Sequence, residues 1–210
     1  MPDVLELRPK ERRLQNAAPL TVSDRPVPDR RRAEAAAREL LRALALDVDA
    51  ESTRETPRRM VEVYAELLSP SSFNPTTFPN DGGYDELVVA RGIPFHSLCE
   101  HHLLPFVGVA HVGYLPGERI IGLSKLARLV DYFARSVQVQ ERLTTQIARW
   151  LEDELRPAGV GVVLEAEHMC MSLRGVQKDG AKTITSALHG AVRDQPGTRQ
   201  EFLALTGRPC

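Results

Sequence analysis

Residues 157–173, PAGVGVVLEAEHMCMSL, contain the pattern that decides the fold class. The Pro-Ala-Gly triplet is typical of a turn, and the valine-rich run after it predicts a strand over 160–173. Segments 86–94 and 104–114 have the same character and precede it in the chain, and 182–187 follows it. We therefore expect at least two strands on either side of the region in between.

That region predicts two amphipathic helices, at 123–134 and 138–155. Apolar residues recur in both at the three- and four-residue spacing of a buried helical stripe. Two strands, two helices and two strands is the order of an α+β protein with an antiparallel sheet. A short helix near 198–205 is expected to end the chain.

The N-terminal part is predicted to be helical as well. Apolar residues recur at helical spacing from Arg31, and Thr56-Pro57 is typical of a hydroxyl N-cap followed by proline at the first helical position. Residues 71–83 are rich in proline and glycine, which indicates a loop. We expect a tail at 1–30, N-terminal helices at 31–70 and the domain with the candidate site at 84–207.

Composition excludes several classes of protein. The 27 Lys and Arg residues against 28 Asp and Glu give a formal net charge of −1, so no basic field for nucleic acid is expected. No apolar run approaches the roughly 18 residues needed to cross a membrane, and no signal peptide is recognisable. Three cysteines cannot form a disulfide framework, so we expect a cytoplasmic protein.

The cysteines and histidines predict a metal site. Cys99 and His102 stand three residues apart, which puts both on one side of a turn, and Cys170 follows in a His-x-Cys segment. Two thiolates and an imidazole suit zinc, and three protein ligands leave a fourth position for water, as in catalytic sites. The alternative is that the cysteines are buried small hydrophobic residues and the histidines are surface polar groups.

The predicted strand 160–173 adds a geometric expectation. Alternate residues of a strand share a face, so His168, Cys170, Ser172 and Arg174 should point the same way. His168 would then lie roughly 7 Å from Cys170, and Arg174 roughly 13 Å along the row on the other side. A proton carrier, a metal ligand and a cation are expected in one line.

Two helix starts are candidate binding elements. Ser124, Lys125 and Arg128 open a helix whose free N–H groups favour an anion such as a polyphosphate. Gln140 and Glu141 open the next helix, where a carboxylate also serves the helix dipole alone. Both segments therefore have an ordinary structural explanation beside the functional one.

Together these segments resemble the GTP cyclohydrolase I family over roughly residues 56–205. The matching stretches are SLCEHHLLPF (97–106), IGLSKL (121–126), QVQERLT (138–144), HMCM (168–171) and RGVQK (174–178). The resemblance implies an enzyme that hydrolytically opens the imidazole ring of GTP, releases formate and forms 7,8-dihydroneopterin triphosphate. This is the first step of pterin and folate biosynthesis.

The resemblance also implies roles for individual residues. Cys99, His102 and Cys170 would bind Zn²⁺, and His101 and His168 would transfer protons. Glu141, helped by Gln140, would hold the guanine edge, and the triphosphate would be held by Ser124, Lys125, Arg128, Arg174 and Arg59. The fold implied is the tunnelling fold over 84–207, assembled into a homodecamer with active sites between subunits.

One departure and two rival interpretations remain open. Some family members have a lysine three residues after the arginine at position 59, whereas this chain has Glu62, which would repel a triphosphate. A zinc base deaminase uses a similar ligand set, but its His-x-Glu and Pro-Cys-x-x-Cys signatures are absent from this sequence. A non-catalytic pterin or purine binder would need neither His101 nor His168.

Overall fold

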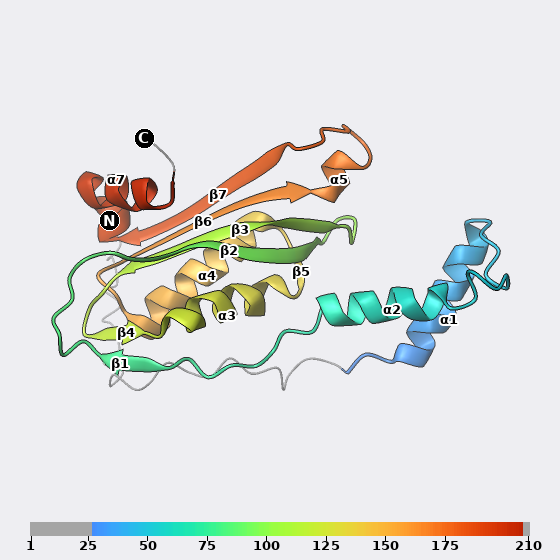
Figure 1. Ribbon diagram of the computed structural model, residues 1–210, viewed down its shortest axis with the longest axis horizontal. Coiled ribbons are helices and arrows are strands. Elements are labelled where there is room, and N and C mark those ends of the chain that lie inside the picture. The colour runs from blue at the N-terminus through green and yellow to red at the C-terminus, as the bar shows by residue number, and fades with distance from the viewer. Residues whose placement is uncertain (1–26, 208–210) are drawn as a thin grey trace, which may run out of the picture.

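The computed structural model describes residues 27–207, so most of the expected tail at 1–30, and Cys210, lie outside the described residues. Helices and strands alternate in groups along the chain (Figure 1). The helices are α1 (Arg30–Ala43), α2 (Thr56–Leu67), α3 (Leu123–Ala134), α4 (Gln140–Leu155), α5 (Met169–Ser172), α6 (Ala191–Asp194) and α7 (Pro196–Leu205). The strands are β1 (Thr77–Pro79), β2 (Val88–Cys99), β3 (Pro105–Leu115), β4 (Arg119–Ile121), β5 (Val137–Gln138), β6 (Gly159–His168) and β7 (Lys182–Gly190).

The main sheet has five strands in the order β5-β2-β3-β6-β7. The pairs β2–β3, β3–β6 and β6–β7 are antiparallel, whereas the two-residue strand β5 runs parallel to the end of β2. Strands β1 and β4 form a separate antiparallel pair. The expected α+β arrangement, an antiparallel sheet with two helices between its strand pairs, is therefore confirmed.

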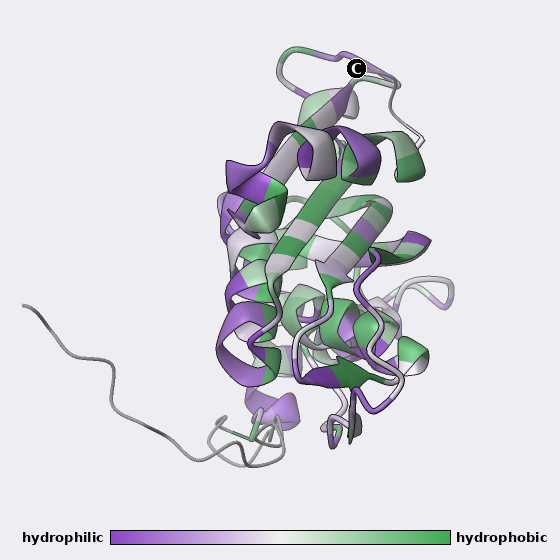
Figure 2. Ribbon diagram, turned by 90° about the vertical axis from the view of Figure 1, so that its left-hand side faces the viewer, coloured by the Kyte–Doolittle hydropathy of each residue, from purple (hydrophilic) through white to green (hydrophobic). Residues whose placement is uncertain are grey.

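Helices α3 and α4 cover one face of the sheet and make the main core with it (Figure 1). Their inward side chains follow the predicted helical stripes: Leu126, Leu129, Leu143, Ile147 and Leu151 are all fully buried. Burying each such side chain contributes about 1.5–3 kcal/mol, which is why these amphipathic segments fold onto the sheet. In Figure 2 the strands at the centre of the view are mostly hydrophobic, and hydrophilic positions gather on outer helical turns.

Helix α7 covers the other face of the sheet at one end only. Its Phe202 is fully buried and packs with Val163 and Val192 in a second, smaller core. Burial along β3 shows where α7 covers the sheet. Near the start of β3, Phe106 is buried and Val107 is exposed, but residues 110–114 are buried on both faces. The opposite end of β3 therefore has one face free, and this is the end that leads to the candidate site.

The expected strand over 160–173 is wrong beyond His168. Strand β6 ends at His168, and α5 follows as a single helical turn. His168 pairs with Phe106 near the start of β3, and Glu167 pairs with Lys182 at the start of β7. Residues beyond His168 thus have no strand on either side to bond with, so the chain coils to satisfy its own backbone groups.

Other boundaries also differ from the expectation. The loop expected at 71–83 contains β1, which pairs with β4. Thr56 is the first helical residue of α2 and not its cap, a place taken by Glu55 without a side-chain cap bond. Strand β2 runs to Cys99, beyond the expected end at residue 94, because β3 stays paired with it to Leu98.

Helices α1 and α2 pack on each other and extend beyond the sheet (Figure 1). Helix α2 is joined to the body by Tyr64, whose hydroxyl donates to the Leu103 carbonyl at 3.4 Å, and by Arg135, which donates to the Glu66 carbonyl at 3.1 Å. None of the helices between residues 27 and 207 has the length and apolar character needed to cross a membrane.

Candidate metal centre and its surroundings

The turn after β2 brings Cys99 and His102 to the same side. The Cys99 carbonyl accepts from the N–H groups of His102 (3.3 Å) and Leu103 (2.8 Å), and the Cys99 N–H donates to the Leu104 carbonyl at 2.9 Å. Leu103 adopts a left-handed conformation with φ 53°, which closes the turn. The backbone of Cys99 therefore fixes the short Cys-x-x-His segment, as the spacing predicts.

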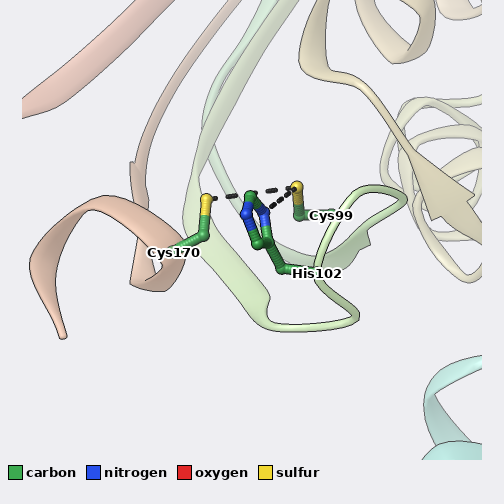
Figure 3. Close-up of side chains that lie close together, drawn as sticks. All are labelled: Cys99, His102 and Cys170. Carbon is green, nitrogen blue, oxygen red and sulfur yellow. Dashed lines mark hydrogen bonds between the residues drawn. The ribbon is translucent and has the colours of Figure 1, made fainter. Parts of the chain in front are cut away.

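Cys170 reaches this turn from the single-turn helix α5 (Figure 3). Its Sγ lies 4.0 Å from Cys99 Sγ, and Cys99 Sγ lies 3.8 Å from His102 Nδ1. One ligand atom from each of the three residues lies within 4.8 Å of the other two. The structure thus brings the three expected ligands together, from two segments about seventy residues apart.

The cluster favours a cation. Burial, together with the neighbouring Cys99 sulfur, raises the pKa of the Cys170 thiol, because a second negative charge there is unfavourable. Arg174 Nη1 lies 3.2 Å from His102 Nε2 and is exposed. The two thiols are free of any disulfide, and a bound cation would offset the charge of both thiolates.

His101 lies beside the cluster on the exposed side of the turn. Its Nδ1 is 3.8 Å from Cys99 Sγ, and its ring meets that of His102 edge-on with centroids 6.3 Å apart. Its ring remains exposed, so it is free to meet a substrate.

His168 is held on two sides at the end of β6. Its ring stacks on that of the fully buried Phe106, with centroids 4.6 Å apart and an angle of 4° between the planes. Its Nε2 lies 2.8 Å from Gln140 Oε1. Burial lowers the pKa of His168, and the nearby Glu141 carboxylate raises it to a lesser extent. The neutral ring is therefore favoured more than in a free histidine.

Gln140 and Glu141 both lie in the first turn of α4 but face different surroundings. The Gln140 side chain is 1% exposed, and its Nε2 is bonded to Leu164 O, Thr183 O and Thr185 Oγ1. Glu141 is exposed and close enough to His168 to affect its pKa. The carboxylate is thus available to a ligand, whereas the amide is already committed within the protein.

The expected anion-binding residues are not all near the cluster. Arg174 is beside it, but Ser124 and Lys125 lie at the N-terminal end of α3, next to β4 (Figure 1). The other end of α3 leads into β5 beside Cys99, so Ser124 is about 15 Å away along the helix axis. Arg128 is exposed one turn further on, and Arg59 is exposed on α2. One chain therefore holds the metal cluster apart from the start of α3, where Ser124 and Lys125 lie.

Two contributors to the site were missed from the sequence. Phe106 was quoted only as part of the family match, although its place two residues into a strand beginning beside the metal turn is a usable signal. Arg142 bonds Glu100 Oε2 at 2.5 Å, the Val137 carbonyl at 3.0 Å and Gln138 Oε1 at 2.9 Å. Arg142, on α4, thereby links the turn after β2 to β5. Glu100 and Arg142 are 42 residues apart in the chain, so no local sequence pattern predicts this contact.

Comparison with known proteins gives consistent matches. The family model of GTP cyclohydrolase I matches residues 33–207. A GTP cyclohydrolase 1 of Streptomyces avermitilis is 56% identical over 184 residues, covering 84% of this chain and 90% of the relative. One of Aquifex aeolicus is 49% identical over 177 residues, covering 84% and 96%. Among solved structures, an archaeosine synthase QueF-Like in the apo form covers 51% of this chain and 94% of its own, with 15% identity and a TM-score of 0.39.

Proposed function

The chain belongs to the GTP cyclohydrolase I family, and from that membership we propose how its own residues carry out the reaction. It is a hydrolase that acts on GTP. The observation that carries the proposal is the Cys99–His102–Cys170 cluster, with His101 beside it and His168 two residues before Cys170 in the chain. We propose that the enzyme opens the guanine imidazole ring, releases formate and yields 7,8-dihydroneopterin triphosphate.

We propose that the metal is zinc, and the spacing of the donor atoms supports this. A tetrahedral zinc site with Zn–S of about 2.3 Å and Zn–N of about 2.0–2.1 Å places two sulfurs about 3.8 Å apart and sulfur and nitrogen about 3.6 Å apart. The corresponding distances are 4.0 Å between Cys99 and Cys170, and 3.8 Å between Cys99 and His102. When bound, zinc would supply an open coordination position and lower the pKa of a water there to about 7.

The protein residues around this position would supply the proton transfers. C8 of guanine is a poor electrophile until its ring is protonated, and water is a poor nucleophile until it loses a proton. A histidine that is neutral near pH 7 can both accept and donate a proton, which is typically worth about 10²–10⁴ in rate. His168, fixed by Phe106 and Gln140, and His101, exposed beside Cys99, are placed to do this.

We propose that Glu141 selects guanine and that Arg174 binds phosphate. Guanine presents N1–H and an exocyclic amine on one edge, and a carboxylate accepts from both at once. Glu62 lies 2.6 Å from Arg58, but Arg58 also pairs with Glu55. One cation is thus shared by two carboxylates, and the remaining negative charge beside Arg59 weighs against a large contribution of Arg59 to phosphate binding.

The separation of Ser124, Lys125 and Arg128 from the metal cluster supports an active site between subunits. We propose that these residues hold the triphosphate of a GTP bound at the cluster of a neighbouring copy, within a homodecamer. Among residues 27–207, β5 and β7 are the outer strands of the main sheet, and these edges are suited to join sheets of neighbouring copies into a closed barrel. A cytoplasmic location is supported by the free thiols of Cys99 and Cys170, which need reducing conditions.

Incubation of the zinc-loaded protein with GTP tests the function directly. We expect one formate per GTP and a product that becomes fluorescent on oxidation, as pterins do. His101→Ala and His168→Ala should retain zinc and fold but lose turnover by about 10²–10⁴. Either variant turning over GTP within about threefold of the unmodified protein would contradict that histidine's role.

A further inference from the structure

The buried amide of Gln140 has a single consistent orientation. Its Nε2 position lies 3.3 Å from Leu164 O and 3.0 Å from Thr183 O. Both partners are backbone carbonyl oxygens, which only accept hydrogen bonds, so this end of the amide must be the NH₂ group. The opposite orientation would place an oxygen against two oxygens in the protein interior, at the cost of unsatisfied buried groups.

Two threonine hydroxyls support the same orientation. Thr144 Oγ1 donates its single proton to the main-chain carbonyl of Gln140, at 2.7 Å. The 2.6 Å contact between Thr144 Oγ1 and Thr185 Oγ1 must then use the Thr185 proton. Thr185 Oγ1 is left with lone pairs and accepts from Gln140 Nε2 at 3.1 Å. The three acceptors around Gln140 Nε2 share its two protons, and none of them has a proton to donate back to that position.

The orientation of the Gln140 amide determines which ring nitrogen of His168 carries the proton. The remaining end of the amide, Gln140 Oε1, lies 2.8 Å from His168 Nε2 and can only accept. We propose that Gln140 is a positioning residue that keeps the proton on His168 Nε2 and so leaves Nδ1 as the nitrogen that exchanges its proton during the reaction. This rests on the proposed role of His168 as a proton carrier.

The same contacts distinguish this role from substrate binding. A side chain that is 1% exposed, with both ends of its amide hydrogen-bonded, reaches guanine only by giving up those bonds. Phe106 fixes the plane of the His168 ring by stacking, and Gln140 fixes which edge points inward. The neighbouring Glu141 is exposed and needs no such rearrangement.

A double-mutant cycle on the zinc-loaded enzyme tests the proposal. Gln140→Met keeps the size of the side chain and removes its hydrogen bonds, and we expect kcat to fall about 10- to 100-fold, as when a partner orienting a functional histidine is lost. KM for GTP should stay within about threefold. In a His168→Ala background the same change should lower kcat by less than about twofold, because Gln140 acts through that ring.

Thr206→Val is the control. Thr206 is also a buried polar residue, 4% exposed, and its Oγ1 donates to the Leu203 carbonyl at 2.7 Å at the end of α7, on the part of the sheet away from the metal cluster. We expect a similar fall in melting temperature and a kcat within about threefold of the unmodified enzyme.

Several results would overturn the proposal. A higher KM with unchanged kcat would make Gln140 a substrate contact, and equal losses of kcat in both backgrounds, or in Thr206→Val, would make it merely structural. Solid-state ¹⁵N NMR of histidine-labelled unmodified protein identifies the tautomer without any Gln140 variant, and a proton on Nδ1 of neutral His168 would refute it. An active His168→Ala, or no formate from the unmodified enzyme, would instead refute the proposed function.

Discussion

Two neighbouring residues of the candidate site, Gln140 and Glu141, have different surroundings because their side chains leave the first turn of α4 in different directions. Gln140 points into the sheet and is bonded to the interior of β6 and β7, whereas Glu141 points outward from the same turn of α4. In the turn after β2, Cys99 is buried whereas His101 and His102 are exposed, although a single tight turn carries all three. At this scale the chemistry depends on individual side-chain directions, and single substitutions should separate the functions.

Cys170→Ser is expected to remove most of the metal. The oxygen of serine is a poor replacement for a thiolate in a site with only three protein ligands, and the remaining two ligands are too few to hold zinc firmly. Metal analysis of the purified variant should show well under one zinc per subunit. His101→Ala, next to the cluster, is the control and should retain zinc; full occupancy in Cys170→Ser would refute the ligand assignment.

Glu141→Ala and Glu141→Gln are both expected to lower kcat/KM for GTP, by about 100-fold, while zinc content is unchanged. Two charge-assisted hydrogen bonds are lost in the alanine variant, and in the glutamine variant an NH₂ group meets a guanine donor. ATP, which lacks the paired donors, should not be used by the unmodified enzyme. If Glu141 serves only the dipole of α4, kinetics would change by less than about fivefold and only stability would fall.

The elements of the sheet divide it into a supported end and an open end. Where α7 lies on the sheet, β3 and β6 are buried on both faces and glycines allow close approach: a Cβ at Gly161 would lie 2.6 Å from Phe202 Cζ. At the other end the strands stop, and the turn after β2, α5 and the start of α4 meet there. The closely packed end fixes the strands relative to one another, and the irregular end holds the candidate site.

Gly161→Val is expected to destabilise the protein by about 1–3 kcal/mol, because the fully buried Phe202 ring has no room to move aside and α7 would be pushed from the sheet. Chemical denaturation measures the loss. Gly197→Ala in the same helix is the control, since a Cβ there meets nothing within 4 Å. An unchanged midpoint in Gly161→Val would show that α7 contributes little to the fold.

In the whole molecule the two proposed halves of the active site lie at opposite ends of α3. The metal cluster is beside β5, and Ser124 and Lys125 are beside β4 (Figure 1). Helix α3 is about 18 Å long and packed in the core, so bending cannot bring its ends together. A site that uses both halves would take them from two copies, as in closed symmetric oligomers.

Mixing two inactive variants tests this arrangement. Cys170→Ser should lose the metal half and Lys125→Ala, combined with Arg128→Ala, the phosphate half, so each protein alone should be inactive. If each site takes one half from each of two copies, random co-assembly of equal amounts restores about a quarter of the sites. Activity that stays absent after co-refolding, with mixed oligomers verified by mass spectrometry, would place both halves in one chain.

The sequence alone determined the features that depend on local periodicity and on spacing. The apolar stripes of α3 and α4, the strands around them and the Cys-x-x-His turn each depend on a short stretch of sequence, so the α+β order and the grouping of Cys99 with His102 were predictable. The expected row of His168, Cys170 and Arg174 on one strand is wrong, because a strand exists only as far as its neighbours pair with it, and β3 and β7 both begin opposite the end of β6. The inward turn of Gln140 toward His168 and the distance of Ser124 from Cys99 were likewise decided by tertiary packing, since both depend on contacts between segments that the chain separates by tens of residues.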